Sequence, residues 1–245
     1  MLSKSLKMKS WIISLVLCCL CFAATGQFGL TTKQNFNDFP YWDDRATAAL
    51  RTDVDVFSNG QELGIDYWFR LKNKRIEFLP QLAYSLSRTN VVGDPFVSGY
   101  KLDQAHFNFN TNIYFLDLKN DCDCPTFSKQ GNSLSKGIFL QLSPGLVYSF
   151  EEINYVSRDP DHLHANNFSY KLGLGIGIDI GITNLFTITP MAGINWYPAI
   201  NWQNFDLLHY EATIVSNTPN ETTLRQIQVG VRVGFRPDYK NGMRR

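Results

Sequence analysis

Apolar and polar residues alternate with a period of two along most of this chain, most strictly between residues 171 and 183. One face of an extended strand there holds Leu172, Leu174, Ile176, Ile178, Ile180 and Ile182. The other face holds Gly173, Gly175, Gly177, Asp179 and Gly181. Such a strand suits a membrane barrel, because aliphatic side chains can contact lipid while glycine fits a crowded interior.

The same alternation predicts eight strands, at residues 46–58, 61–72, 75–88, 101–118, 137–150, 168–182, 185–198 and 222–236. Their polar faces collect Arg51, Asp53, Asp55, Asp66, Arg70, Glu77, Gln81, Asn108, Asn110, Asn112, Asp179, Gln226, Gln228 and Arg232. The interior of an eight-stranded barrel is just wide enough for side chains, so inward charges are expected to pair and fill it. The predicted fold is therefore all-β: an eight-stranded antiparallel up-and-down transmembrane β-barrel with a polar, largely plugged interior.

The first 26 residues have the pattern of a signal peptide. Lys4, Lys7 and Lys9 precede an apolar run, and Ala24 and Gly26 supply the small residues that signal peptidase requires. We expect cleavage after Gly26, followed by an N-terminal segment at 27–45, the barrel at 46–236 and a tail at 237–245. No later segment has the ~20 continuous apolar residues of a transmembrane helix, so strands must form any membrane span.

The predicted strand ends divide the connections into two groups. With both termini in the periplasm, the periplasmic connections are 72–74, 119–136 and 183–184. The outer connections are 59–60, 89–100, 151–167 and 199–221. Short turns on one side and longer loops on the other are typical of outer-membrane barrels, with 59–60 and 119–136 as exceptions. The net charge of +1 and the charged fraction of 18% argue against a nucleic-acid partner.

Cys122 and Cys124 are the only cysteines expected in the mature chain. A disulfide is favoured by their even number in an oxidising compartment, although a bridge across one residue closes a small ring. A reduced or intermolecular pair, or a metal site with Asp121 and Asp123, are the alternatives. Two cysteines make half a zinc site, so we assign no metal residues.

The predicted outer loops hold two candidate sites. Asp159, Asp161, His162 and His164 lie within six residues and could bind a divalent cation or bridge to lipopolysaccharide phosphates, although a solvated loop has the same composition. The last loop is rich in large apolar residues: Trp202, Phe205, Leu207, Leu208 and Tyr210. This composition suits either a partner-binding surface or a lid over the barrel mouth.

Catalysis is not expected. Some outer-membrane barrels that modify lipid use His with Ser or Asp near the outer rim, and His106, His209 and Ser98 are the residues to consider here. Their spacing defines no Ser/His/Asp set on the predicted strands. We therefore assign no catalytic or cofactor-binding residue and expect no cofactor, with a lipid-modifying enzyme as an alternative.

The glycine-rich strand at 172–182 and the last strand, which reads Leu-Arg-Gln-Ile-Gln-Val-Gly-Val-Arg-Val-Gly-Phe from Leu224, resemble small outer-membrane β-barrels of Gram-negative bacteria. The chain is similar to the OmpA/OmpX-like barrels and to the PorT-like barrels of bacteria with type IX secretion. The resemblance implies an outer-membrane location, contact with lipid and lipopolysaccharide, and a structural, surface-interaction or secretion-accessory role in the cell envelope. Envelope or secretion-complex proteins are then possible partners. A secreted, soluble lipocalin-like barrel is the alternative.

Overall fold

The computed structural model describes residues 27–39, 43, 59–71, 76–90, 97–115, 137–155, 164–183, 185–201 and 221–235. Their strands are β1 (Gln27–Asp38), β2 (Asn59–Arg70), β3 (Ile76–Asn90), β4 (Val97–Ile113), β5 (Ile138–Tyr155), β6 (His164–Ile178), β7 (Ile180–Gly181), β8 (Phe186–Asn201) and β9 (Glu221–Phe235). No helix among these residues is long and apolar enough to cross a membrane.

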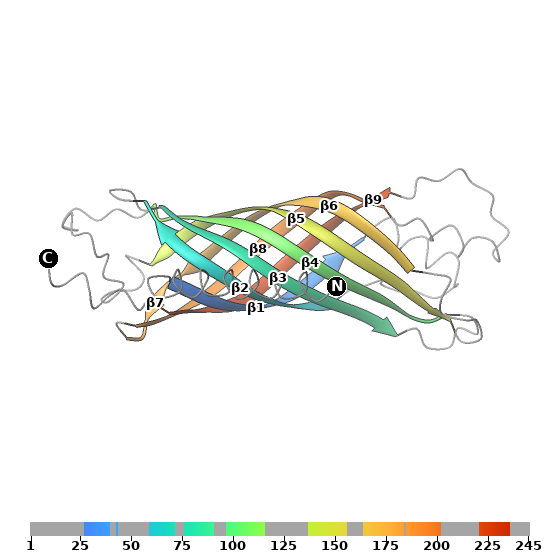
Figure 1. Cartoon of the computed structure of the whole chain (residues 1–245), viewed down its shortest axis with the longest axis horizontal. Coiled ribbons are helices and arrows are strands. Elements are labelled where there is room, and N and C mark those ends of the chain that lie inside the picture. Colours follow the sequence, from blue (N-terminus) through green and yellow to red (C-terminus); the bar gives the residue numbers. More distant parts are fainter. Residues whose placement is uncertain are drawn as a thin grey trace, which may run out of the picture.

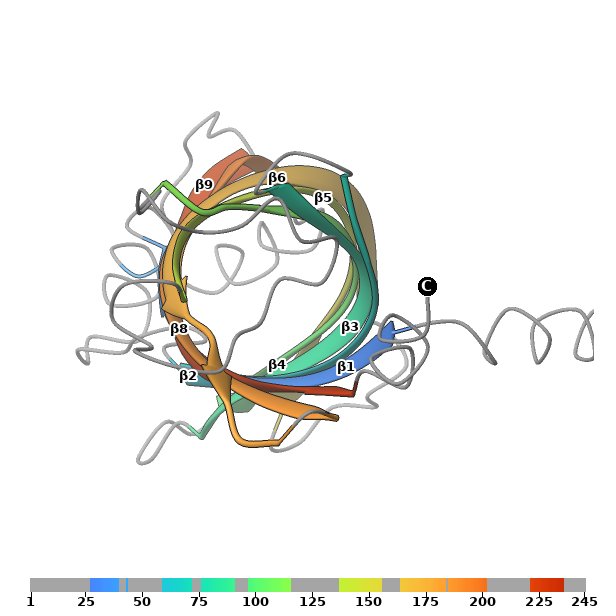
Figure 2. The same cartoon turned by 90° about the vertical axis from the view of Figure 1, so that its left-hand side faces the viewer.

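The strands form one closed antiparallel barrel. Consecutive strands pair along the chain from β1 to β6, while β8 pairs with β9, and β9 returns to pair with β1. Pairing of β6 with β8 closes the circuit. The strands cross the barrel obliquely in Figure 1, and the view in Figure 2 looks along its interior. Closure leaves no sheet edge with unpaired backbone groups, which is the condition for strands to span a membrane.

Strand β7 continues the line of β6, and both pair with β8. We call each line of strand in the barrel wall a stave and count β6 and β7 as one, so the barrel has eight staves. The interruption falls at Asp179, whose backbone amide donates to the carbonyl oxygen of Gly137 at 2.9 Å. Beyond it, Ile180 and Gly181 pair with Ile188 and Thr187 of β8. The predicted strand at 168–182 is therefore confirmed as a barrel stave with a local break.

Side chains alternate between the two faces of the wall, with a register shift between Tyr197 and Ile200 in β8. The outward face exposes large apolar residues on every stave, among them Leu30, Leu63, Leu82, Phe107, Leu146, Leu172, Ile194 and Val229. Inward residues are buried, and many of them are polar or charged. Of the predicted inward set, the buried members are Asp66, Glu77, Gln81, Asn108, Asn110, Asn112, Asp179, Gln226, Gln228 and Arg232.

The predicted position of the first strand, at residues 46–58, is wrong. The stave that pairs with both β2 and β9 is Gln27–Asp38, so the barrel begins within the segment that we expected to precede it. The alternation at 46–58 is more regular than that of β1, whose outward positions include Thr32 and Gln34 between Leu30 and Phe36. The first stave is identified better by the partners of its inward residues than by the regularity of its alternation. Lys33 on β1, for example, forms an ion pair with Glu62 on the neighbouring stave. The whole of 46–58, with Arg51, Asp53 and Asp55, lies outside the described residues.

The revised first stave also changes the connections. Residues 39–58, 91–96, 156–163 and 202–220 now leave one end of the barrel, whereas 71–75, 114–137 and 182–185 leave the other. The very short predicted outer connection at 59–60 is wrong, since Asn59 and Gly60 begin β2. Following the orientation expected from the sequence, we label the first end the outer end and the second the periplasmic end. Connection 114–137 is still the exception among the periplasmic turns.

Candidate functional site

The barrel interior contains the described chain's densest group of polar side chains, and it divides into three levels. At the periplasmic level, Arg232 on β9 holds Asp66 on β2, with 2.8 Å from Nε to Oδ2 and 2.6 Å from Nη2 to Oδ1. The Tyr114 hydroxyl donates to Glu77 at 2.7 Å and also contacts Asp179. The Thr189 hydroxyl donates to the other oxygen of Asp179. Charged groups from distant parts of the chain are thus tied together inside the barrel.

At the middle level, an ion pair is embedded in amide side chains. The Lys33 ammonium donates to Glu62 Oε1 at 2.8 Å and to Gln228 Oε1 at 3.3 Å. Gln228 in turn donates to Asn35 at 3.0 Å and to the second oxygen of Glu62 at 3.2 Å. The buried charges of Lys171 and Glu62 interact electrostatically. Such pairing and hydrogen bonding offset the desolvation of buried charges.

A second group of amides lies on the inward faces of β3, β4 and β5. Gln81 accepts hydrogen bonds from Asn108 at 3.0 Å and from Asn110 at 3.2 Å. Gln141 donates to Asn112 at 2.8 Å. Amide side chains both donate and accept, so neighbouring amides can bond one another without a net charge.

At the outer level, the buried side chains become apolar. Tyr100, Leu102, Tyr197, Ile200 and Leu224 lie near the outer ends of their strands, and each is no more than 1% exposed. We call these five residues the apolar layer. Glu151 lies directly opposite Leu102 in the ladder and is also buried. Within the described part of the chain, neither of its carboxylate oxygens has a hydrogen-bond partner.

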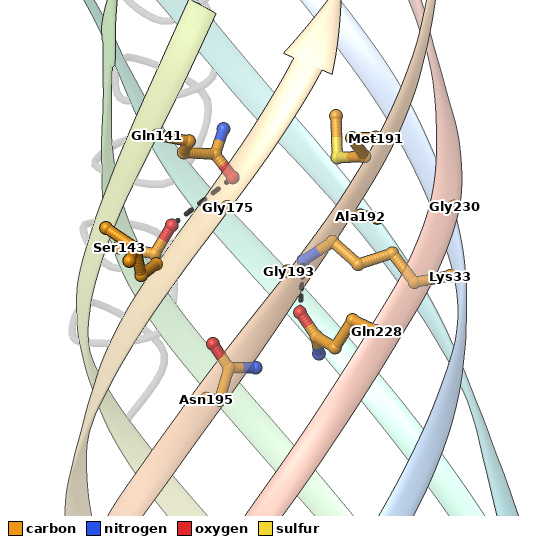
Figure 3. Close-up of a pocket in the computed structure, with 11 residues that line it drawn as sticks. Lys33, Gln141, Ser143, Gly175, Met191, Ala192, Gly193, Asn195, Gln228 and Gly230 are labelled. Carbon is orange, nitrogen blue, oxygen red and sulfur yellow. Dashed lines mark hydrogen bonds between the residues drawn. The ribbon is translucent and has the colours of Figure 1, made fainter.

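The glycine-rich wall leaves one small hollow in this interior. Figure 3 shows it between Gln141 and Ser143 on one side and Lys33 and Gln228 on the other, with Gly175 and Gly193 between them. Its volume is ≈ 20 Å³, which is enough for a single water molecule.

Elsewhere the glycines make room for larger partners. A Cβ at Gly29 would overlap the Arg232 guanidinium, and one at Gly177 would overlap the ring of Phe139. A Cβ at Gly145 would come within 2.6 Å of Asn108 Oδ1. The inward glycines therefore leave space for the large inward side chains beside them, as the alternation predicted.

Two residues considered for catalysis are not brought together. The Ser98 hydroxyl donates to the backbone oxygen of Asn154 at 3.0 Å, whereas His106 Nε2 lies 2.9 Å from the hydroxyl of Ser85. The other ring nitrogen of His106 has no partner among the described residues, so no carboxylate orients this imidazole.

The other sequence candidates fall outside the described residues. These are Cys122 and Cys124, the loop residues Trp202, Phe205, Leu207, Leu208 and Tyr210, the acidic and histidine cluster at 159–164 (apart from His164, the first residue of β6), and His209. In the part of the chain that is described, no group of three or more His, Cys, Asp or Glu residues is arranged to hold a metal ion.

Sequence reasoning missed several interior residues. Lys33 and Asn35 were missed with the first stave, and Glu62 and Lys171 were not named among the inward residues. His106 was considered only as a catalytic candidate and not as an interior residue. The sequence did contain a signal for these residues, because positions two apart in a strand share one face. Lys171 has the same parity as Gly173 and Gly175, and this places it inside.

Fold and interior together define a closed eight-stranded antiparallel barrel with an apolar outer face and a hydrogen-bonded, ion-paired interior. No protein-family model and no curated protein sequence matches the chain.

Solved structures with a similar fold are outer-membrane and surface proteins of bacteria. Neisserial surface protein A is 9% identical with a TM-score of 0.46, covering 86% of this chain and 97% of its own. Ail, the attachment invasion locus protein of Yersinia pestis, is 8% identical with a TM-score of 0.43 and covers 86% and 97%. A major outer membrane protein from Thermus thermophilus is 10% identical with a TM-score of 0.45 and covers 86% and 99%.

Proposed function

We propose that this protein is an outer-membrane β-barrel that spans the lipid bilayer and binds partners through its outer end. The observation that carries the proposal is the reversal of polarity across the wall. Leu63, Leu82 and Phe168 each expose more than half of their side chains on the outward face. Inward neighbours such as Glu62, Gln81 and Lys171 are at least 98% buried. A soluble lipocalin-like barrel would need the opposite arrangement, with polar residues in water.

Closure and connection lengths favour the outer membrane in particular. A bilayer provides no hydrogen-bond partner for backbone groups, so strands cross it only as a closed barrel. Outer-membrane barrels combine short periplasmic turns with longer outer loops. Connections 71–75 and 182–185 fit the first class, while 39–58 and 202–220 fit the second.

The interior supports a barrel that does not conduct. Arg232 and Asp66 form a buried ion pair that passes over β1, and Lys33 and Glu62 form a second buried pair between neighbouring staves. The apolar layer lies at the outer end, and the hollow in the glycine-rich wall is large enough for one water only. We expect the purified protein to give no steady ion current in a planar lipid bilayer. Large, stable open currents would contradict the plugged interior.

A binding role is then assigned to the outer end. The staves are occupied by lipid on one face and by one another's polar groups on the other, which leaves the outer connections for recognition. The segment with Trp202, Phe205, Leu207, Leu208 and Tyr210 has the large apolar residues of an interface. A secretion-accessory or other envelope-complex role and a standalone surface-interaction role both use such a segment.

Two experiments test this role. Co-purification from detergent-solubilised outer membranes should recover a stoichiometric envelope partner if the protein belongs to a complex, whereas recovery of the barrel alone favours the standalone role. Deleting residues 204–217 should leave the barrel assembled and abolish partner or surface binding. If the deleted form keeps every binding property of the wild type, the segment is a lid and not an interface.

A further inference from the structure

The outward face of the barrel carries a groove with a volume of ≈ 840 Å³. One side of the groove is formed by successive cross-strand partners from five staves: Ile176, Ala192, Val229, Gln34 and Gln61. Pro190, Val231 and Thr32 form the other side. The backbone between the two rows, at Gly177, Met191, Gly230 and Lys33, forms its floor.

Most of this groove is apolar, but one end is not. Gln34 and Gln61 lie directly opposite each other on β1 and β2 and face outward with the lipid-facing residues. Neither amide has a hydrogen-bond partner among the described side chains. An unsatisfied amide in hydrocarbon is unfavourable, so a ligand that supplies both a donor and an acceptor would bind there preferentially.

The groove is oblique to the bilayer. Gln61 is two residues from the outer end of β2, whereas Ile138, at the other end of the groove, is the first residue of β5 at the periplasmic end. Six staves at about 4.8 Å spacing give a length of roughly 24 Å. This length suits an extended fatty acyl chain that enters the groove from the outer leaflet at Gln61.

We propose that this groove binds an amide-linked acyl chain of lipid A, the lipid anchor of lipopolysaccharide, with the amide linkage at Gln34 and Gln61. A secondary amide has one N–H donor and one carbonyl acceptor, which match the two groups of a glutamine side chain. Phospholipid acyl chains are joined through esters, which only accept hydrogen bonds. The inference rests on the proposed outer-membrane location, since lipid A is confined to the outer leaflet.

Native mass spectrometry of the full-length mature protein tests the site. The purified, delipidated barrel is supplied in detergent with lipid A or with phosphatidylethanolamine, and the lipid that stays bound is counted. The wild type should retain lipid A in preference to phosphatidylethanolamine. The Gln34→Leu/Gln61→Leu double variant should bind lipid A at least tenfold more weakly, and Ala192→Phe should lower retention of both lipids by filling the groove.

A matched control distinguishes the groove from general surface effects. Ala105 is also a small outward residue, but it lies on β4, away from the groove. Ala105→Phe should therefore retain lipid A as the wild type does. Unchanged retention in the double variant, equal retention of both lipids by the wild type, or a dimer in place of a lipid adduct would overturn the proposal.

Each sample is also checked for folding by heat-dependent migration on gels, and Gln61→Leu alone replaces the double variant if that variant does not fold. A folded barrel that needs detergent but shows no lipid A preference refutes this site only. A wild type that is soluble and monodisperse without detergent refutes the membrane location itself.

Discussion

Arg232 and Asp66 are joined by two hydrogen bonds, although 166 positions separate them in the sequence. They come from β9 and β2, the two neighbours of β1, and Gly29 lies directly opposite Asp66 in the ladder. A side chain at Gly29 would occupy the position of the guanidinium. The pair therefore reaches across the first stave because that stave has no side chain at this point.

Replacing Arg232 with Leu should strongly destabilise the barrel. The change leaves the buried Asp66 without its cation, and breaking a buried ion pair in this way costs about 3–5 kcal/mol. Val231→Leu is the matched control, because Val231 is the next residue and faces outward. Its effect should be within about 0.5 kcal/mol. Urea unfolding of the two variants in lipid bilayers measures both effects, and equal tolerance would refute the assignment of faces.

The Lys33 and Glu62 pair should show energetic coupling. Lys33→Met leaves a buried carboxylate, and Glu62→Leu leaves a buried ammonium, so each single variant should lose about 3–5 kcal/mol. The Lys33→Met/Glu62→Leu double variant should lose less than the sum by about 1–3 kcal/mol, because neither charge is left alone. A double-mutant cycle on unfolding free energies measures this interaction free energy between Lys33 and Glu62. Strict additivity would show that the two side chains do not interact.

Gly177 should not accept a side chain while Phe139 is present. A Cβ at Gly177 would overlap the Phe139 ring, so Gly177→Ala should cost about 1–3 kcal/mol through overpacking. Shortening the partner in Gly177→Ala/Phe139→Leu should recover part of that loss. If the Phe139→Leu substitution adds its full cost to that of Gly177→Ala, the contact between these two positions does not cause the loss of stability in Gly177→Ala.

The alternation of side chains predicted most of this fold. Seven of the eight staves, and the inward direction of residues such as Asp179 and Gln228, follow from parity within a strand. The first stave does not, because Thr32 and Gln34 weaken the outward apolar pattern of β1. Its place is decided by pairing with β2 and β9, and such long-range pairing has no signal within the strand itself.

The sequence predicted that inward charges form ion pairs, but it did not predict which residues pair with each other. Opposite charges on inward faces predict pairing, but the partners depend on the stagger between staves. Arg232 could have met any of several acidic residues. It meets Asp66 because the register of β1 places Asp66 opposite Gly29 and Arg232 opposite Thr31, only two residues apart on that strand. The apolar layer at the outer end was not predicted. Leu102 and Leu224 continue the inward parity of the polar residues Gln104 and Gln226, and Ile200 lies beyond a register shift in β8.

The proposed orientation predicts which connections face the cell exterior. Single cysteines at Asp159 and Asn204 lie in connections from the outer end, and one at Asn73 lies in a turn at the opposite end. In intact cells, a membrane-impermeant maleimide should label the first two and spare the third, with Cys122 and Cys124 replaced by Ser to remove background. Labelling at Asn73 alone would invert the topology.

Fractionation of cells with gel analysis tests the membrane-barrel assignment most directly. The mature protein should be recovered with the outer membrane, and unheated samples in dodecyl sulfate should migrate differently from boiled ones, because a closed barrel resists unfolding by the detergent. Recovery in the soluble periplasmic fraction, with identical migration before and after boiling, would contradict the assignment.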